Sequence, residues 1–454
     1  MSETTEGRDP VTDPATDPTA EQATDPVAEA AGPGGEPKLQ AGAPVDDEPA
    51  AQAEPARPAR PTVMLLGAGE LSRELVLAFQ RLGAEVVAVD RYADAPAYPV
   101  ADRSVVATMS DADALTAVIE REAPQYVVAE STAVAVDALI AVAERGSVEV
   151  FPTPRAIRLS YDREGLRRLA ADELGLPTAP FWFAGSVEEL TAVAQHAGFP
   201  LVVRPVTGPA GSGQSVLLRE DDVEPAWHRA IAAGHFAQNR VMAETVVEID
   251  YEVTMLTVRT TGPAGPTIRF CEPIGHHHRN GEVLELWQPQ QMSPVALDAA
   301  KSIAARIVNS LGGRGVYGVE LLVRDDEVYF SDVRVRPQDT GLVTLRSQRL
   351  SHFELHARAI LGLAVDTIMI SPAAAEVHYG GSEAAWPGGT GGAELTAVLR
   401  EALSVPESDV RLFGGPDDET DAPHRLGVAL ATAPDATAAR RQVRQVSTAL
   451  RRLW

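Results

Sequence analysis

The sequence predicts an α/β protein that begins with a doubly wound domain on a parallel sheet and continues into domains built on antiparallel strands. Three patterns lead to this fold class. A strand, a helix and a strand follow one another over residues 62–90, a glycine-rich loop joins two strands over 201–218, and an acidic turn joins two apolar strands over 316–333. With 454 residues, the chain is long enough for two to four domains.

The composition excludes several classes of protein. Asp and Glu total 64 against 39 Lys and Arg, and the resulting net charge of -25 argues against a partner that is nucleic acid or an anionic membrane. A single cysteine rules out a disulfide framework and suits a reducing compartment. No run of 18 apolar residues occurs, and the N-terminus lacks the basic and apolar regions of a secretion signal. We therefore expect a cytoplasmic protein.

The N-terminal segment differs from the rest of the chain. Its first 60 residues hold 13 acidic and 4 basic residues, 10 of the 34 prolines and no Ile, Phe, Trp or Tyr. Such a segment cannot bury enough apolar surface to offset its conformational entropy. We expect residues 1–61 to form a disordered acidic tail rich in Asp-Pro pairs.

A βαβ unit follows the tail. The strand at 62–66 ends in Gly-Ala-Gly at 67–69, where glycines let a ligand approach the backbone and helix amides can face an anion. The dinucleotide fingerprint is incomplete, because Arg73 stands where the third glycine belongs. A dinucleotide site with Asp90 on the ribose, a site for another small ligand and an ordinary tight turn all remain open.

Further strands at 126–130 and 148–152 extend the predicted parallel sheet. Ligands bind such sheets along the edge formed by the carboxyl ends of the strands. Glu70 and Glu130 both lie at that edge, so we expect them to face one crevice suited to an amine or to ribose hydroxyls.

The middle of the chain has a different pattern. Asp162 is placed to cap a helix, and a strand at 201–205 leads into the glycine-rich segment 207–214 and then into a strand at 215–218. A glycine-rich hairpin between antiparallel strands can cover phosphates with its backbone amides. The alternative is a mobile hairpin without a ligand.

The acidic hairpin gives the most specific expectation. If it is centred on Asp326, Glu320 on the strand 316–323 falls opposite Asp332 on the strand 328–333. Carboxylates opposed on a strand pair lie about 5 Å apart and repel each other. A cation relieves the repulsion, and two carboxylates with nucleotide phosphates suit Mg²⁺. The alternative is a solvated pair on an exposed face.

Three consecutive histidines at 276–278 raise the question of a metal site. Consecutive side chains point in different directions, and no cysteine other than Cys271 is near, so we do not expect zinc and expect His277 and His278 in a loop. Cys271 ends a strand-like segment, and we expect a small core residue there and not a nucleophile.

Together the motifs resemble one family, the formate-dependent phosphoribosylglycinamide formyltransferases. The resemblance covers about residues 62–454. It rests on VMLLGAGE at 63–70, VDRYADAP at 89–96, DREGLRRLAADELGLPT at 162–178, GH at 275–276, WQPQQMSP at 287–294, GVEL at 318–321, RP at 336–337, DTG at 339–341 and LGVALATA at 426–433.

The resemblance implies an ATP-grasp enzyme of purine biosynthesis. Members use ATP and Mg²⁺ to convert formate into formyl phosphate, which the amine of glycinamide ribonucleotide then attacks. The implied fold has a pre-ATP-grasp domain at 62–160, an ATP-grasp domain at 161–366 and a small C-terminal β-rich domain at 367–454, with a loop at 380–392. The family also implies a homodimer.

The family's motifs assign residues to each ligand. ATP would contact Arg163, Arg204, Pro209, Ala210, Gly211, Ser212, Gly213, Gln214, Glu244, Thr245, Val246 and Val247, with Glu252 on the ribose. The ribonucleotide would contact Glu70, Leu71, Glu130, Asp339, Gly415, His424 and Arg425. Mg²⁺ would sit on Glu320 and Asp332, and Arg336 and Asp339 would serve catalysis.

Six positions depart from the family's pattern. They are Arg204, Ser212 and Gly415 in place of lysine, Asp332 in place of glutamate, and His424 and His277 in place of arginine. Arginine keeps the charge of lysine, whereas losing the cation at 415 forfeits a charge-assisted hydrogen bond of about 1.5–3 kcal/mol. These departures keep open a second hypothesis, a degenerate or neofunctionalised ATP-grasp carboxylate-amine ligase paralogue, and a third, a nucleotide-binding protein without enzymatic activity.

Overall fold

The computed structural model describes residues 60–208, 213–233, 239–279, 282–380, 392–413 and 424–453. The predicted acidic tail up to residue 59 and most of the predicted loop at 380–392 lie outside these ranges. Residues 59–454 belong to one structural unit, which contains three sheets. Among the described helices, none has both the length and the apolar character needed to cross a bilayer.

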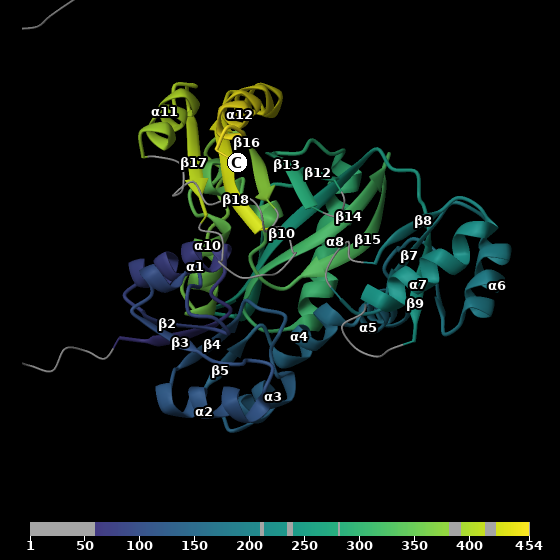
Figure 1. The fold of residues 1–454 in the computed structure, drawn as a ribbon, viewed down its shortest axis with the longest axis horizontal. Coiled ribbons are helices and arrows are strands. Elements are labelled where there is room, and N and C mark those ends of the chain that lie inside the picture. Colours follow the sequence, from purple (N-terminus) through teal and green to yellow (C-terminus); the bar gives the residue numbers. More distant parts are fainter. Residues whose placement is uncertain are drawn as a thin grey trace, which may run out of the picture. The chain divides into compact units, whose positions relative to one another are not determined.

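The first sheet is parallel, as predicted, and its strand order is β3-β2-β1-β4-β5. Figure 1 labels four of its strands, β2 to β5. Its strands are β1 (Thr62–Leu66), β2 (Glu85–Asp90), β3 (Arg103–Val106), β4 (Tyr126–Ala129) and β5 (Glu149–Phe151). The helices of this region are α1 (Glu70–Arg81), η1 (Tyr98–Val100), α2 (Ala112–Glu122), α3 (Val136–Glu144) and α4 (Pro154–Tyr161). Alternate residues of β1 enter two different cores, since Val63 and Leu65 pack with α1, whereas Met64 and Leu66 pack with α2 and α3.

The second sheet has four antiparallel strands in the order β6-β9-β7-β8. They are β6 (Phe181–Ala184), β7 (Leu201–Pro205), β8 (Ser215–Leu217) and β9 (Val241–Thr245). Because Leu201 pairs with Leu217 and Val203 with Ser215, the predicted glycine-rich hairpin is confirmed. The helices of this region are α5 (Arg163–Arg168), η2 (Leu169–Glu173), α6 (Val187–Ala197), η3 (Glu220–Asp222) and α7 (Val223–Ala233), and Asp162 caps α5 as predicted.

The third sheet has nine strands and reaches into the C-terminal region. Along its main path the order is β15-β14-β10-β12-β13-β16-β18-β17, with β11 paired to β10. The strands are β10 (Tyr251–Gly262), β11 (Gly265–Phe270), β12 (Ile274–Arg279), β13 (Glu282–Gln288), β14 (Gly315–Arg324), β15 (Glu327–Arg334), β16 (Ala373–Gly380), β17 (Ser408–Leu412) and β18 (His424–Thr432). The C-terminal strands therefore extend an existing sheet and do not form a separate one.

Six helices accompany this sheet. They are α8 (Pro294–Leu311), η4 (Asp339–Gly341), α9 (Thr344–Ser347), α10 (His352–Ile360), α11 (Gly392–Ala402) and α12 (Ala436–Leu450). Apolar residues of α8, such as Ile307 and Val308, pack with Val319 and Leu321 of β14. Val443 and Val446 of α12 share a core with the small residues of β16 and β18, so the C-terminal region is mixed α/β and not mainly β.

The acidic hairpin has the predicted opposition but a different register. Glu320 pairs with Asp332, yet beyond it Leu321 pairs with Phe330 and Arg324 with Glu327. The turn is therefore the two-residue Asp325-Asp326 and is not centred on Asp326. An irregularity in the ladder beside Glu320 takes up one extra residue of β15, Ser331, and restores the opposition of the two carboxylates.

The histidines at 276–278 lie in β12, so the prediction that His277 and His278 belong to a loop is wrong. Side chains alternate across a strand, so His276 and His278 share one face and His277 lies on the other. The His277 ring packs against Trp287 with 4.9 Å between ring centroids. Cys271 is buried, as predicted, and burial raises the pKa of its thiol to about 12.

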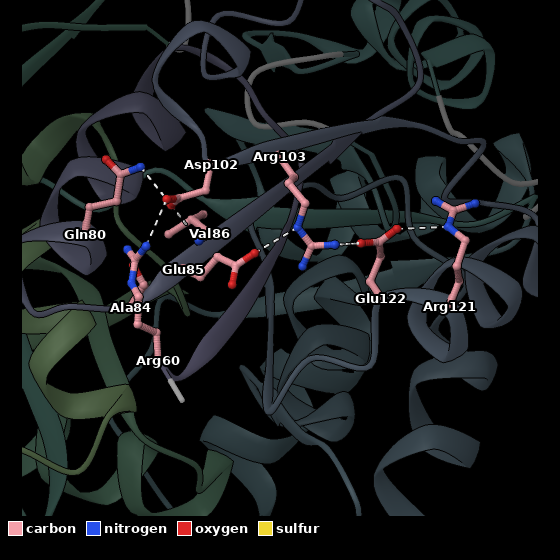
Figure 2. A network of polar contacts seen from close by, with 9 residues as sticks. All are labelled: Arg60, Gln80, Ala84, Glu85, Val86, Asp102, Arg103, Arg121 and Glu122. Carbon is pink, nitrogen blue, oxygen red and sulfur yellow. Dashed lines mark hydrogen bonds and ion pairs between the residues drawn. The ribbon is translucent and has the colours of Figure 1, made fainter. Parts of the chain in front are cut away.

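A polar network joins the start of β1 to its neighbours (Figure 2). The carboxylate of Asp102 accepts hydrogen bonds from the backbone amide of Val86 at 2.9 Å, from Gln80 Nε2 at 3.0 Å and from Arg60 Nη1 at 3.3 Å. Burial opposes ionisation of Asp102, but these donors outweigh it and lower its pKa. Arg60, the first described residue, is thus held at the amino ends of β2 and β3.

We predict that Asp102→Ala lowers the free energy of unfolding by about 1–2 kcal/mol, because three donors lose their acceptor and the amide of Val86 is partly buried. Urea denaturation measures this difference. Asp137→Ala is the matched control, since Asp137 is highly exposed and pairs only with the exposed Arg158 at 2.6 Å among the described contacts. That variant should stay within about 0.5 kcal/mol of the parent, and equal losses in the two variants would contradict the role of the network.

Candidate active site

One large cavity, of about 1230 Å³, brings together residues from all parts of the predicted site. It is lined by the ends of β1 and β4, by the base of the glycine-rich hairpin and by one face of β14 and β15. The predicted site residues in its wall are Glu70, Leu71, Glu130, Arg163, Arg204, Gln214, Glu252, Glu320, Asp332, Arg336, Asp339 and Arg425.

Other predicted residues are not in this wall. Gly213, His424 and the stretch 244–247 are described but do not line the cavity. Pro209, Ala210, Gly211, Ser212 and Gly415 lie outside the described residues. The stretch from Glu244 also has two backbone amides in use, because Thr245 donates to the carbonyl of Pro180 at 3.0 Å and Val246 donates to that of Pro200 at 3.3 Å.

The Gly-Ala-Gly turn after β1 forms one rim of the cavity. Gly67 has φ of +109°, and a Cβ there would lie 2.8 Å from the backbone nitrogen of Ser131, so only glycine fits. Asp90 Oδ2 accepts the amide of Ala68 at 2.7 Å, and its Oδ1 accepts the amide of Arg91. Asp90 thus holds the turn through Oδ2 and accepts a bond from its own neighbour through Oδ1, so each oxygen already has a backbone partner.

Glu130 is a deeply buried carboxyl group of the wall. Its side chain is only 5% exposed, and burial raises its pKa to about 7, although the charge of Arg336 opposes the shift. His356 Nε2 lies 3.7 Å from Glu130 Oε1, but burial lowers the pKa of His356 to about 3, so the imidazole is neutral and does not stabilise the carboxylate. Glu130 therefore gains or loses its proton near neutral pH.

A second acidic group gathers around Arg425. The carboxylate of Asp339 accepts hydrogen bonds from both Nε and Nη2 of Arg425, the second at 2.8 Å. It also accepts one from the hydroxyl of Tyr379 at 3.0 Å. Burial would raise the pKa of Asp339, but these partners outweigh burial and lower it. Glu70 lies 3.5 Å from Arg425 Nη1. Arg425 is thus a partner of two carboxylates. Fewer of its donors are available to a substrate phosphate than the sequence led us to expect.

Two arginines hold the base of the glycine-rich hairpin. Arg163 donates to the carbonyls of Pro205 and Gly208, each at 2.9 Å. Arg204 Nη2 pairs at 3.0 Å with Glu244, whose other oxygen pairs at 2.5 Å with the buried Arg167. Arg167, which sequence reasoning missed, also donates to two carbonyls of β15 and so ties α5 to the acidic hairpin.

Arg334 is the second residue that sequence reasoning missed. It lies 3.2 Å from Asp332 and 3.5 Å from Glu320, so an internal cation already offsets the repulsion that we assigned to a bound metal. Burial still raises the pKa of Glu320, while the charge of Asp332 raises the pKa of Arg334. The signal was present in the sequence, because Arg334 follows Asp332 by two residues and shares its face of β15.

Comparisons with known proteins identify the family. Family models match residues 61–161 (ribonucleotide synthetase preATP-grasp domain), 169–353 (ATP-grasp domain) and 395–450 (PurT, C-terminal). The formate-dependent phosphoribosylglycinamide formyltransferase of Burkholderia mallei (strain SAVP1) is 51% identical over 399 residues, which are 87% of this chain and 96% of that protein. The chain belongs to this family of ATP-grasp enzymes. The predicted fold class and family are confirmed.

Two solved structures resemble this chain equally well in fold but differ in sequence identity. Glycinamide-RNase-transformylase T from Mycobacterium tuberculosis is 55% identical, with a TM-score of 0.71 over 86% of this chain and 99% of that one. N5-carboxyaminoimidazole ribonucleotide synthetase from Thermus thermophilus has the same TM-score, 0.71, over 85% and 98%, but only 23% identity. The second protein shares the fold alone, so sequence identity is what distinguishes the formyltransferase family here.

We predict that Glu130→Gln stabilises the protein at pH 8 but not at pH 4. In the folded protein the pKa of Glu130 is raised to about 7 from 4.5. The contribution of the protonated Glu130 carboxyl group to the free energy of unfolding is therefore fully present below pH 4.5 and is lost as pH rises through 7. The loss is about 3 kcal/mol, equivalent to roughly 3 °C in Tm for a chain of this size. Thermal unfolding across this pH range measures it. The exposed Glu144→Gln should show no such trend, and a parallel trend in both variants would refute the assignment.

We also predict that Arg334→Ala increases the thermal stabilisation by Mg²⁺. Without Arg334, Glu320 and Asp332 lose the cation that pairs with both of them, so Tm should fall in metal-free buffer, and Mg²⁺ should restore more of it than it adds to the parent. Scanning fluorimetry with and without Mg²⁺ tests this. Arg324→Ala, on the same hairpin but paired with the exposed Glu248, is the control. An equal response in all three proteins would exclude Mg²⁺ from the carboxylate pair.

Proposed function

We propose that this chain formylates glycinamide ribonucleotide with formate and ATP, through formyl phosphate, as a step of purine biosynthesis. The observation that carries the proposal is the single cavity shared by the turn after β1, the arginines of the glycine-rich hairpin and the paired carboxylates of β14 and β15. A ligase that joins a carboxylate to an amine needs its nucleotide and its acceptor side by side, and both sets of residues face this space.

The nucleotide half of the proposal rests on the hairpin base. Arg204 has one nitrogen on Glu244 and lines the cavity, so other nitrogens of its guanidinium are placed to reach a phosphate. Arg163 fixes the carbonyls at the start of the glycine-rich loop. Since the amides of Thr245 and Val246 are already bonded, the adenine edge would be read by the amide of Val247 and by carbonyls of the stretch 244–247.

The residues also fit Mg²⁺. Glu320 and Asp332 supply two hard oxygen ligands that are 18% and 21% exposed, which is open enough for phosphates and water to complete an octahedron. When bound there, Mg²⁺ would neutralise charge on the transferred phosphate. For this to happen Arg334 must move away from at least one carboxylate.

The acceptor half rests on the five-stranded sheet. Glu70 and Glu130 stand at the carboxyl ends of its strands and face the cavity, where they suit an amine and ribose hydroxyls. With a pKa near 7, Glu130 is ionised in part of the molecules at neutral pH and can take a proton from the attacking amine. Arg336 and Asp339 flank the same space.

Three coarser proposals accompany the activity. We place domain boundaries near residues 160 and 366, expect a homodimer of the 48.2 kDa chain, and expect the protein to be cytoplasmic. Light scattering after size exclusion gives the mass of the assembly. A mass of one chain at micromolar concentration would reject the dimer without bearing on the activity.

We predict that purified protein with ATP, Mg²⁺, labelled formate and glycinamide ribonucleotide releases ADP and phosphate and transfers the label to the ribonucleotide. Glu320→Gln should abolish transfer, because the amide cannot replace a charged ligand of Mg²⁺, while far-ultraviolet circular dichroism stays unchanged. Glu327→Gln, at the exposed end of the same hairpin, is the matched control and should retain activity.

The alternative, a paralogue with another acceptor, predicts a different pattern. The wild type would then incorporate no formate at any ribonucleotide concentration but would still release ADP with another carboxylate and amine. Absence of ADP release with every substrate pair, despite ATP binding, would favour the third hypothesis, a binding protein without catalysis.

A further inference from the structure

A cluster of one carboxylate and two imidazoles lies on the cavity face of the nine-stranded sheet. Glu252 of β10, His276 and His278 of β12 each offer one ligand atom, and these three atoms lie within 4.8 Å of one another. Glu252 Oε2 is 2.9 Å from His278 Nδ1 and 3.6 Å from His276 Nδ1. Ligand atoms on a tetrahedral Zn²⁺ are about 3.3 Å apart, given bonds of about 2.0–2.1 Å.

The strand pairing explains why these residues meet. β10 and β12 are antiparallel neighbours, and Val253 pairs with Gly275, so Glu252 and His276 point from adjacent positions to the same face. His278 follows on that face one step along β12, and its ring lies 4.8 Å from that of His276. Figure 1 shows β10 and β12 within the same sheet.

An unsatisfied nitrogen points into the cluster. His276 is 3% exposed, its Nε2 lies 3.0 Å from the hydroxyl of Thr254, and its Nδ1 is buried without a hydrogen bond in the described structure. A buried polar atom without a partner costs free energy, and a ligand would remove that cost. The unsatisfied Nδ1 is therefore placed to act as a ligand atom of the cluster.

We propose that Glu252, His276 and His278 form a binding site for a divalent transition metal of the Zn²⁺ type. Two imidazoles and one carboxylate are a common ligand set of zinc sites that keep a fourth, open position, and here that position opens onto the cavity. Thr254 supplies the outer hydrogen bond that orients a metal-binding histidine. Mg²⁺ prefers oxygen ligands only and is not expected to compete.

The site overlaps the nucleotide site, a consequence that rests on the proposed function. Glu252 is the residue expected on the ribose of ATP, and a metal ligand cannot accept the ribose hydroxyls in the same way. Zn²⁺ and ATP would therefore exclude each other, which makes Zn²⁺ an inhibitor that acts on ATP binding and not on the Mg²⁺ carboxylates.

The direct test measures binding of Zn²⁺ to the full-length protein, without nucleotide, in competition with a chromogenic chelator. We expect one Zn²⁺ to bind per chain, and millimolar Mg²⁺ should not change this binding. When Co²⁺ replaces Zn²⁺ as the probe, we expect the visible absorption spectrum of a tetrahedral site. His278→Gln should weaken binding at least tenfold, and Thr254→Val should weaken it by roughly tenfold through the outer hydrogen bond. His277→Gln, whose ring lies on the opposite face against Trp287, is the matched control and should bind as the parent does.

The outcomes separate the two proposals. Zinc binding that survives His278→Gln, or falls equally in His277→Gln, overturns the site. In a metal buffer that fixes free Zn²⁺, the apparent Kd for ATP should rise with Zn²⁺ in the parent but not in His278→Gln, and a Kd that does not change while Zn²⁺ is bound overturns the overlap. Failure of ATP to bind in zinc-free buffer would refute the proposed function instead and leave the metal site standing.

Discussion

Repulsion between Glu320 and Asp332 is the constraint around which the charges of the cavity are arranged. The two carboxylates are direct neighbours across β14 and β15, largely removed from water, where Coulomb interactions are stronger than at a surface. Arg334 reaches both of them. Arg167 then joins the same hairpin to Glu244 through carbonyls of β15, and Glu244 in turn holds Arg204. Each charge in this chain of contacts has an opposite charge beside it.

Because these charges are already paired, we expect some ligands to bind by displacing an internal partner. A cation on the two carboxylates would displace Arg334, and a phosphate at Arg425 would compete with Asp339. Removing one member of a buried ion pair is costly, because it leaves an uncompensated charge. We therefore expect part of the attraction for each such ligand to be offset by the internal pair that it displaces.

The sequence was most informative where one strand or one turn decides the outcome. The βαβ unit at 62–90 and the opposition of Glu320 and Asp332 followed from local patterns. The exact register of β14 and β15 did not follow from the sequence, because one extra residue in β15 moves the turn without changing the apolar pattern. The attachment of β16 to β13 was equally hidden, since pairing between strands some 90 residues apart leaves no local signal. The loop expected for His277 and His278 was wrong because β12, in which side chains alternate between two faces, occupies these positions.

The departures from the family's pattern also look different in three dimensions. An ammonium group in place of the Arg204 guanidinium would have to choose between Glu244 and a phosphate, whereas the planar guanidinium can bond Glu244 along one edge and keep donors along the other. We therefore expect Arg204 to serve the proposed nucleotide site as well as a lysine would. The case for an altered acceptor then depends on the residues proposed for the substrate phosphate, where His424 stands beside Arg425 but outside the cavity wall, and where Arg425 is already shared between Asp339 and Glu70.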